Sequence, residues 1–194
     1  MYGLGGQMAI CIPEKKLSMC TTADLILNGT GVQPIYDAFF DCLENVDLLP
    51  SNEKDREALD RRNQSLTLEP IQGRSDKKTV RIHLGKCDLP IEQLKIKNEM
   101  LTLTVEGQEW KIPYCDGGYA KGRFPICMDQ CITTGAWIHE DQFWLRSVLC
   151  GDWSVTMQLM VMIRDHLVSV RMSSSLRECL DGWNGEAIGT VVEI

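Results

Sequence analysis

Residues 1–22 read MYGLGGQMAICIPEKKLSMCTT and decide how the first part of the chain folds. Two runs of apolar and small side chains, residues 8–12 and 17–22, flank the segment from Pro13 to Lys16. A Pro-Glu-Lys-Lys segment between two such runs is typical of a tight turn, because proline presets φ for a turn. The preceding glycines permit a positive φ or a close approach of the backbone to a neighbour. The sequence therefore predicts a β-hairpin with a glycine-rich entry.

The next patterned stretch, residues 32–46, has the periodicity of an amphipathic helix. Thr30 can cap this helix, and Pro34 falls in its first turn, where proline is tolerated. The acidic side chains lie opposite an apolar face, which consists of Val32, Ile35, Tyr36, Phe39, Leu43 and Val46. We expect this helix to follow the hairpin and to pack against it.

The order of these motifs resembles the last two sheet strands of the serine hydrolases related to class C β-lactamases and penicillin-binding proteins. The matching residues are Gly3 to Gln7, Ile12-Pro13-Glu14 and Leu17 to Thr22, and the family also has a helix after these strands. In that family the first strand begins with a Lys-Thr-Gly or His-Thr-Gly box that lines the active site. The box falls here on Met1-Tyr2-Gly3, of which only the glycine is kept, and the match covers about a quarter of the chain.

The resemblance implies acyl transfer by a serine in a Ser-x-x-Lys box, with backbone N–H groups stabilising the oxyanion. It places Gly3, Leu4 and Gly5 on the substrate-side strand, with the N–H of Leu4 as one oxyanion donor. Two Ser-x-x-Lys matches, at Ser51 and Ser75, lie in polar, turn-like stretches, whereas a nucleophile needs a buried helix start in a cleft. We therefore expect no catalytic residue in this chain and no activity from the chain alone.

Residues 51–65 are almost wholly polar and predict a linker between two domains. We assign residues 1–50 to the hairpin and its helix, and residues 66–194 to a second domain. That domain contains short runs with β periodicity separated by Gly, Asn and Asp turns, at residues 80–84, 94–97, 100–105, 109–112, 136–138, 142–146, 153–163, 167–171 and 187–194. This spacing predicts a mainly β (α+β) chain whose second domain is an antiparallel barrel of about eight strands.

The second domain also resembles the lipocalin-like barrel appended to some of these hydrolases. The residues that carry this likeness are Ala136-Trp137-Ile138-His139-Glu140-Asp141, the alternating strand through Leu145, and a following Trp-Ser-x-Thr strand. An eight-stranded barrel can hold one small apolar ligand, so an alternative function is a stand-alone binding module. The reading frame upstream of Met1 distinguishes the two: Ser-x-x-Lys and Tyr-x-Asn boxes favour the hydrolase.

The net charge, the length of the apolar runs and the cysteine content bear on which partners and which cellular setting suit this chain. A net charge of −7 argues against nucleic acid and anionic membranes, and no apolar run reaches the length of a membrane span. The chain has nine cysteines, and several of them, Cys11, Cys20 and Cys150, lie within apolar strand patterns, which indicates a reducing, cytoplasmic setting. Cys127 and Cys131 have no nearby His or second Cys pair to complete a metal site, and the three histidines form no catalytic set, so we expect neither metal nor cofactor.

The hairpin region predicts a partner of its own. Two strands alone are marginal in water, and an apolar unpaired edge is a template for another chain. We therefore expect residues 1–50 either to dock on the barrel or to pair two chains as a homodimer, with the dimer preferred.

Overall fold

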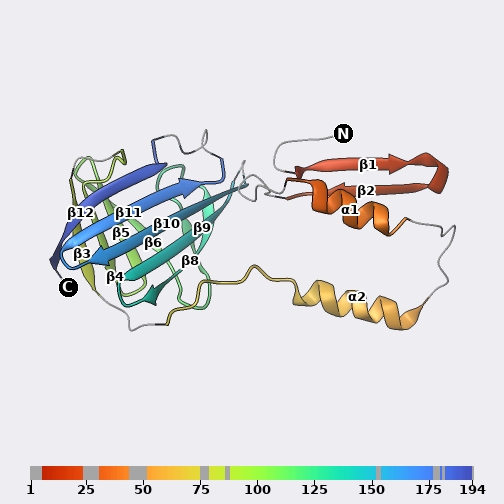
Figure 1. Ribbon diagram of the computed structural model, residues 1–194, viewed down its shortest axis with the longest axis horizontal. Helices are drawn as coiled ribbons and strands as arrows, with labels where there is room; N and C mark the ends of the chain where they lie inside the picture. The colour runs from red at the N-terminus through yellow and green to blue at the C-terminus, as the bar shows by residue number, and fades with distance from the viewer. Residues whose placement is uncertain are drawn as a thin grey trace. The chain divides into compact units, whose positions relative to one another are not determined.

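The computed structural model describes residues 6–23, 31–43, 52–74, 79–85, 88–151, 154–176, 180 and 182–193 of the 194-residue chain. The chain divides into two compact units, Met1–Glu69 and Pro70–Ile194 (Figure 1). Its fold is mainly β, with a hairpin and helices in the first unit and a nearly closed antiparallel barrel in the second. The predicted fold class is confirmed, although the barrel has ten strands where the sequence indicated about eight.

The first unit begins with the predicted hairpin. Strands β1 (Met8–Ile12) and β2 (Leu17–Thr21) pair antiparallel, with Ile12 opposite Leu17 and Met8 opposite Thr21. A single 3-10 turn, η2 (Pro13–Lys15), connects them, and Lys16 adopts the left-handed conformation, φ 53°. The proline and the charged residues thus form the turn, as their physical chemistry requires.

Two helices complete the described part of the first unit. Helix α1 (Gln33–Asp41) has Pro34 in its first turn and no buried residue. Helix α2 (Glu53–Ser65) falls in the stretch predicted as a polar linker, and it too buries nothing. Asn52 caps α2, because its side-chain oxygen accepts hydrogen bonds from the N–H groups of Lys54 and Asp55.

The barrel is an up-and-down meander whose last strand pairs with its first. The ladder order is β6-β5-β4-β3-β12-β11-β10-β9-β8-β7, so hydrogen bonding is interrupted only between β6 and β7 among the described strands. The strands are β3 (Val80–Leu84), β4 (Gln93–Lys97), β5 (Met100–Val105), β6 (Gln108–Pro113), β7 (Ala120–Arg123), β8 (Gln130–His139), β9 (Gln142–Cys150), β10 (Ser154–Arg164), β11 (Leu167–Ser174) and β12 (Gly185–Glu193).

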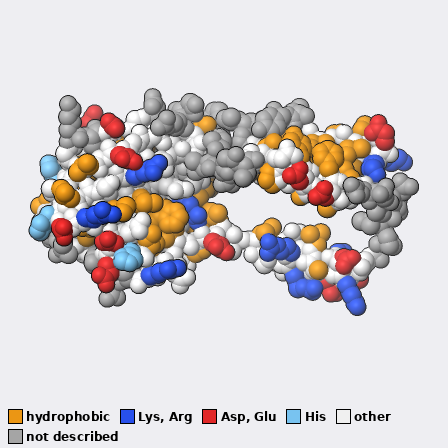
Figure 2. Space-filling model, in the orientation of Figure 1, with side chains coloured by type: hydrophobic (Ala, Val, Ile, Leu, Met, Phe, Trp, Pro, Cys, Tyr) orange, Lys and Arg blue, Asp and Glu red, His pale blue; other side chains and the backbone are white. Residues whose placement is uncertain are grey.

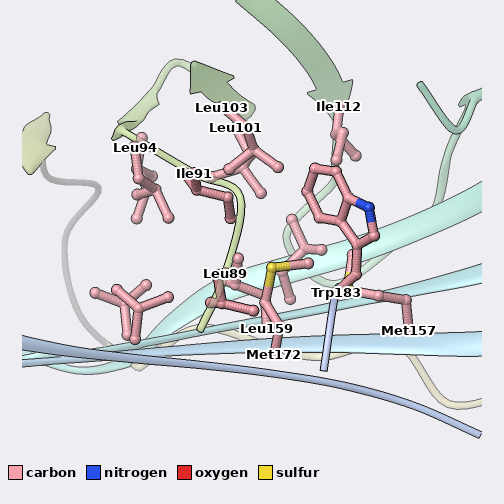
Figure 3. Close-up of a cluster of buried hydrophobic side chains, with 14 of the residues drawn as sticks. Leu89, Ile91, Leu94, Leu101, Leu103, Ile112, Met157, Leu159, Met172 and Trp183 are labelled. Atoms are coloured by element: carbon pink, nitrogen blue, oxygen red, sulfur yellow. The ribbon is translucent and has the colours of Figure 1, made fainter. Parts of the chain in front are cut away.

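Side chains fill the barrel interior. Alternate residues of each strand point inward, as Leu101, Leu103 and Val105 do on β5. Leu89 and Ile91 from the β3–β4 connection and Trp183 from the β11–β12 connection join them (Figure 3). Trp183 stacks on Trp110 of β6 with ring centroids 5.4 Å apart.

The segment that enters the barrel covers the edge of β8 beyond β7. Ile71 donates its N–H to the Thr134 hydroxyl at 2.8 Å, and the Arg74 N–H bonds to the Trp137 carbonyl at 3.0 Å. The Asp116 carboxylate accepts the Gly73 N–H at 2.7 Å; a side chain at position 73 would collide with that carboxylate, which explains the glycine. Strand β7 pairs only with the first residues of β8, and this segment supplies hydrogen-bond partners to the residues of β8 that follow.

Candidate functional site

The sequence-predicted site residues Gly3, Leu4 and Gly5 lie outside the described residues. The description begins at Gly6, whose φ of 89° requires glycine, and whose carbonyl accepts a hydrogen bond from the Thr21 hydroxyl at 2.9 Å. The two hairpin strands that follow these positions are paired, and the hydrogen bond between Thr21 and Gly6 joins them at the open end of the hairpin.

The two faces of the hairpin differ in the size of their side chains. Because residues alternate along each strand, Met8, Ile10 and Ile12 share one face with Leu17, Met19 and Thr21. The other face carries the smaller side chains of Ala9, Cys11, Ser18 and Cys20. One face is thus suited to helix packing through bulky groups, and the other permits close approach.

Helix α1 lies over the bulky face. Met19 of β2 and five residues of the helix region form a shallow apolar groove of about 500 Å³, the five being Pro34, Ile35, Ala38, Phe39 and Cys42. The Lys15 ammonium donates to the Leu43 carbonyl at 3.3 Å, which places the C-terminal end of α1 at the hairpin turn. A cation there also suits the negative end of the helix dipole.

The hairpin and α1 bury very little. Met8, at 5% exposed, is the one large apolar side chain that is buried in the described part of the first unit. Phe40 stacks on Tyr36 with centroids 6.3 Å apart, yet it remains 48% exposed. Figure 2 shows hydrophobic side chains gathered over this unit's hairpin and α1. Among the described residues of this unit, the exposed apolar surface is therefore concentrated at this groove.

No nucleophilic set is found in the described part of the chain. Ser51 and Ser75 lie outside it, and Lys54 sits in the exposed first turn of α2. The serine hydroxyls of Ser65, Ser147, Ser174 and Ser175 bond to backbone, threonine or asparagine groups and not to His or Lys. His139 pairs with Asp141 at 3.0 Å in an exposed turn of the barrel.

Cys127 and Cys131 were considered above as half of a metal site. Cys127 is exposed and Cys131 is buried inside the barrel, and both are free thiols. Burial raises the pKa of each thiol, which disfavours the thiolate that a metal or a nucleophilic reaction needs. Across the described residues, no group of three or more His, Cys, Asp and Glu side chains is arranged to hold a metal ion.

The described apolar side chains of the barrel interior are closely packed. Thirteen apolar side chains among the described barrel residues, including Phe143, Leu145 and Leu159, have no exposed surface. A small apolar molecule would have to displace packed side chains, since interiors at this density lack voids. Ligand binding by the barrel stays a prediction.

Sequence reasoning missed a polar cluster at one end of the barrel. Tyr114 is buried beside Phe143, with ring centroids 5.2 Å apart in an edge-to-face contact. Burial first, and then the negative charges of Glu99 and Asp116, raise the pKa of Tyr114 above its ordinary value. The Asp-Gly-Gly sequence after Tyr114 predicted only a turn, and nothing in it indicated that Asp116 would bond to Gly73.

Comparison with known proteins adds no identity to this geometry. No family model matches the chain, and no curated protein was found to match it. Among the described helices, none is both long enough and apolar enough to cross a membrane. The functional inference therefore depends on the hairpin and α1.

Proposed function

We propose that this chain is the C-terminal part of a serine hydrolase related to class C β-lactamases and penicillin-binding proteins. In this proposal β1 and β2 are the last strands of the catalytic sheet, α1 covers them, and the barrel is an appended domain. The proposal is supported by the order of elements: glycine-rich entry, strand, Pro-Glu-Lys turn, strand and helix.

The observation that carries the proposal is how little the described part of the first unit buries. A hairpin and a helix that bury one large apolar side chain between them cannot stabilise themselves. Their exposed groove and strand edges instead suit a larger sheet that extends beyond them. A C-terminal portion of a catalytic domain has this property, because the rest of its sheet is supplied by the preceding chain.

In this arrangement the chemistry is divided between segments. Gly3, Leu4 and Gly5 border the substrate, and the Leu4 N–H stabilises the oxyanion of the tetrahedral intermediate. The serine nucleophile and its base come from upstream of these residues. The chain alone then has no acyl-transfer activity and needs no cofactor.

The test has two parts. The purified chain is assayed with nitrocefin and a p-nitrophenyl ester, and we expect no turnover above buffer. The transcript is then read upstream of Met1, and an extended product with Ser-x-x-Lys and Tyr-x-Asn boxes is assayed. We expect turnover that is lost when the upstream serine is replaced by alanine.

Two results contradict the proposal. One is turnover by the chain alone that disappears in Ser51→Ala or Ser75→Ala. The other is an in-frame stop codon and a ribosome-binding site directly upstream of Met1, which would make this chain a separate module.

A further inference from the structure

The outer edge of β2 has the composition of a strand that is meant to be paired. Its residues, Leu17 to Thr21, include no charged side chain and no proline, and in the described part of the chain β2 pairs only with β1. Unpaired strand edges attract other strands, and proteins usually block them with charges, prolines or bulges. The edge of β2 carries none of these devices.

The barrel of the same molecule shows what a protected edge looks like. Its two edge strands, β6 and β7, are the only barrel strands whose ladder is interrupted among those described. Strand β6 carries Glu109, Lys111 and Pro113, and β7 carries Lys121 and Arg123. The barrel strands with an unpaired edge thus carry charges or proline, as the paired strand β4 also does at Lys95 and Lys97, whereas β2 carries neither along its length.

The sequence of β2 is complementary to itself in antiparallel register. Pairing two copies about Met19 sets Leu17 opposite Thr21 of the second copy and Ser18 opposite Cys20. Bulky residues then meet bulky residues on one face, small residues meet on the other, and no like charges oppose each other. We infer that two copies of this chain pair through β2, forming a four-stranded antiparallel sheet in the order β1-β2-β2-β1.

This pairing also extends the apolar groove. Met19 lines the groove beside α1, and the two-fold axis brings the second Met19 directly next to it. Both α1 helices then lie on the same face of one sheet. Since each helix ends at its own hairpin turn, the two helices run antiparallel. A four-stranded sheet with helices on an apolar face meets the requirement for independent stability that a hairpin fails.

This inference goes beyond the proposed function and does not rest on it. It concerns the 194-residue chain by itself, in which β2 pairs only with β1 among the described strands. A chain that lacks activity but dimerises supports both proposals, and a chain that stays monomeric overturns only this one.

Light scattering on the whole chain tests the inference between about 0.1 and 100 μM, which spans the dissociation of a dimer with a Kd of about 1 μM. We expect twice the chain mass of 21.9 kDa at the upper end. The double variant Ser18→Lys with Cys20→Lys sets lysine opposite lysine at two symmetric positions. It should raise the dimer Kd by at least about 10-fold.

A matched variant provides the control. Ser18→Glu with Cys20→Lys changes the same exposed positions but sets glutamate opposite lysine across the two-fold axis, so it should dimerise at least as well as the original chain. Hydrogen exchange gives a second measurement: amides of β2 should be protected at high concentration and should exchange faster on dilution. All five tryptophans lie in the second unit, so their fluorescence reports that the barrel is unchanged in both variants.

Three outcomes overturn the inference. A chain that is monomeric at 100 μM shows that β2 does not pair with a second copy. A dimer that the lysine variant leaves intact shows that pairing occurs elsewhere. Equal weakening by both variants shows that the effect comes from the substitutions themselves and not from opposed charges.

Discussion

The barrel and the hairpin region use similar strands and treat their exposed surfaces differently. Barrel strands bury alternate side chains, and thirteen apolar residues among those described have no exposure at all. Strands β1 and β2 with helix α1 bury only Met8 among their large apolar side chains. The barrel's edge strands carry charges and a proline, whereas β1 and β2 carry neither within their length.

The two regions differ in how the backbone hydrogen bonds and apolar side chains of their strands find partners. The barrel is nearly closed, so most of its strands pair on both sides and bury their apolar faces within the unit, and its remaining edges at β6 and β7 need protection only from unwanted pairing. The hairpin leaves both an apolar groove and an uncharged edge, which are the surfaces that another strand would use. The barrel thus has an extensive apolar core, whereas the described part of the first unit buries one large apolar side chain.

The largest test of this comparison is a cavity in the barrel core. Leu159→Ala removes a side chain that has no exposure and packs with Leu145 and Met172 across β9 to β11. We expect the free energy of unfolding to fall by about 2 to 5 kcal/mol, because the packed interior cannot close the cavity. Urea unfolding followed by tryptophan fluorescence measures it. The volume-conserving Leu159→Met should cost less than about 1.5 kcal/mol; equal losses would contradict tight packing.

A smaller effect is expected from the buried hydroxyl pair inside the barrel. Ser147 and Thr133 lie 2.8 Å apart, oxygen to oxygen, and both are fully buried. Ser147→Ala alone leaves the Thr133 hydroxyl without this partner and should cost about 1 to 3 kcal/mol. Adding Thr133→Val should recover part of that loss, because the double variant then has no buried hydroxyl left without its partner. Strictly additive losses in the same urea experiment would show that the two hydroxyls are not coupled.

High pH provides a third test at Tyr114. Its pKa is raised above the ordinary value of 10.0, so above pH 10 the unfolded chain loses this proton while the folded chain keeps it. Stability that is complete below pH 10 should therefore decline as the pH rises, by about 1 kcal/mol at pH 11. Tyr114→Phe cannot ionise and should lose less between pH 8 and pH 11. Identical losses in the two proteins would exclude Tyr114 as the source.

Much of the fold could be predicted because its signals are local. The Pro-Glu-Lys turn and the alternation of Val80, Ile82 and Leu84 each predict their own element without knowledge of a partner. Strand β7 was missed because Ala120 to Arg123 contains no large apolar side chain, and the first half of β8 was missed because Thr133, Thr134 and Gly135 interrupt the pattern. Both strands form through pairing with neighbours rather than by intrinsic preference.

The candidate site was less predictable for a related reason. The sequence indicated an apolar helix face beside a hairpin, but the groove between Met19 and α1 depends on their packing. The cluster of Tyr114, Asp116 and Gly73 joins residues more than 40 positions apart, and no spacing rule connects them. Gly3, Leu4 and Gly5 depend on a family resemblance alone and stay a prediction.

The smallest effect on stability is expected from a leucine-to-alanine substitution in the first unit, which matches the Leu159→Ala substitution in the barrel. Leu59 lies on α2 and is 59% exposed, in a helix that buries no residue. Leu59→Ala leaves no cavity, and alanine is the better helix former, so the helix itself should be unchanged or slightly stabilised. We expect a change within about 0.5 kcal/mol in urea unfolding followed by far-UV circular dichroism, which detects the helices of the first unit, against several for Leu159→Ala. Far-UV circular dichroism should show equal helix content in the variant and the original chain. A loss comparable to that of Leu159→Ala would mean that α2 is packed against a surface in solution, and the first unit would then have a core that its exposed helices do not reveal.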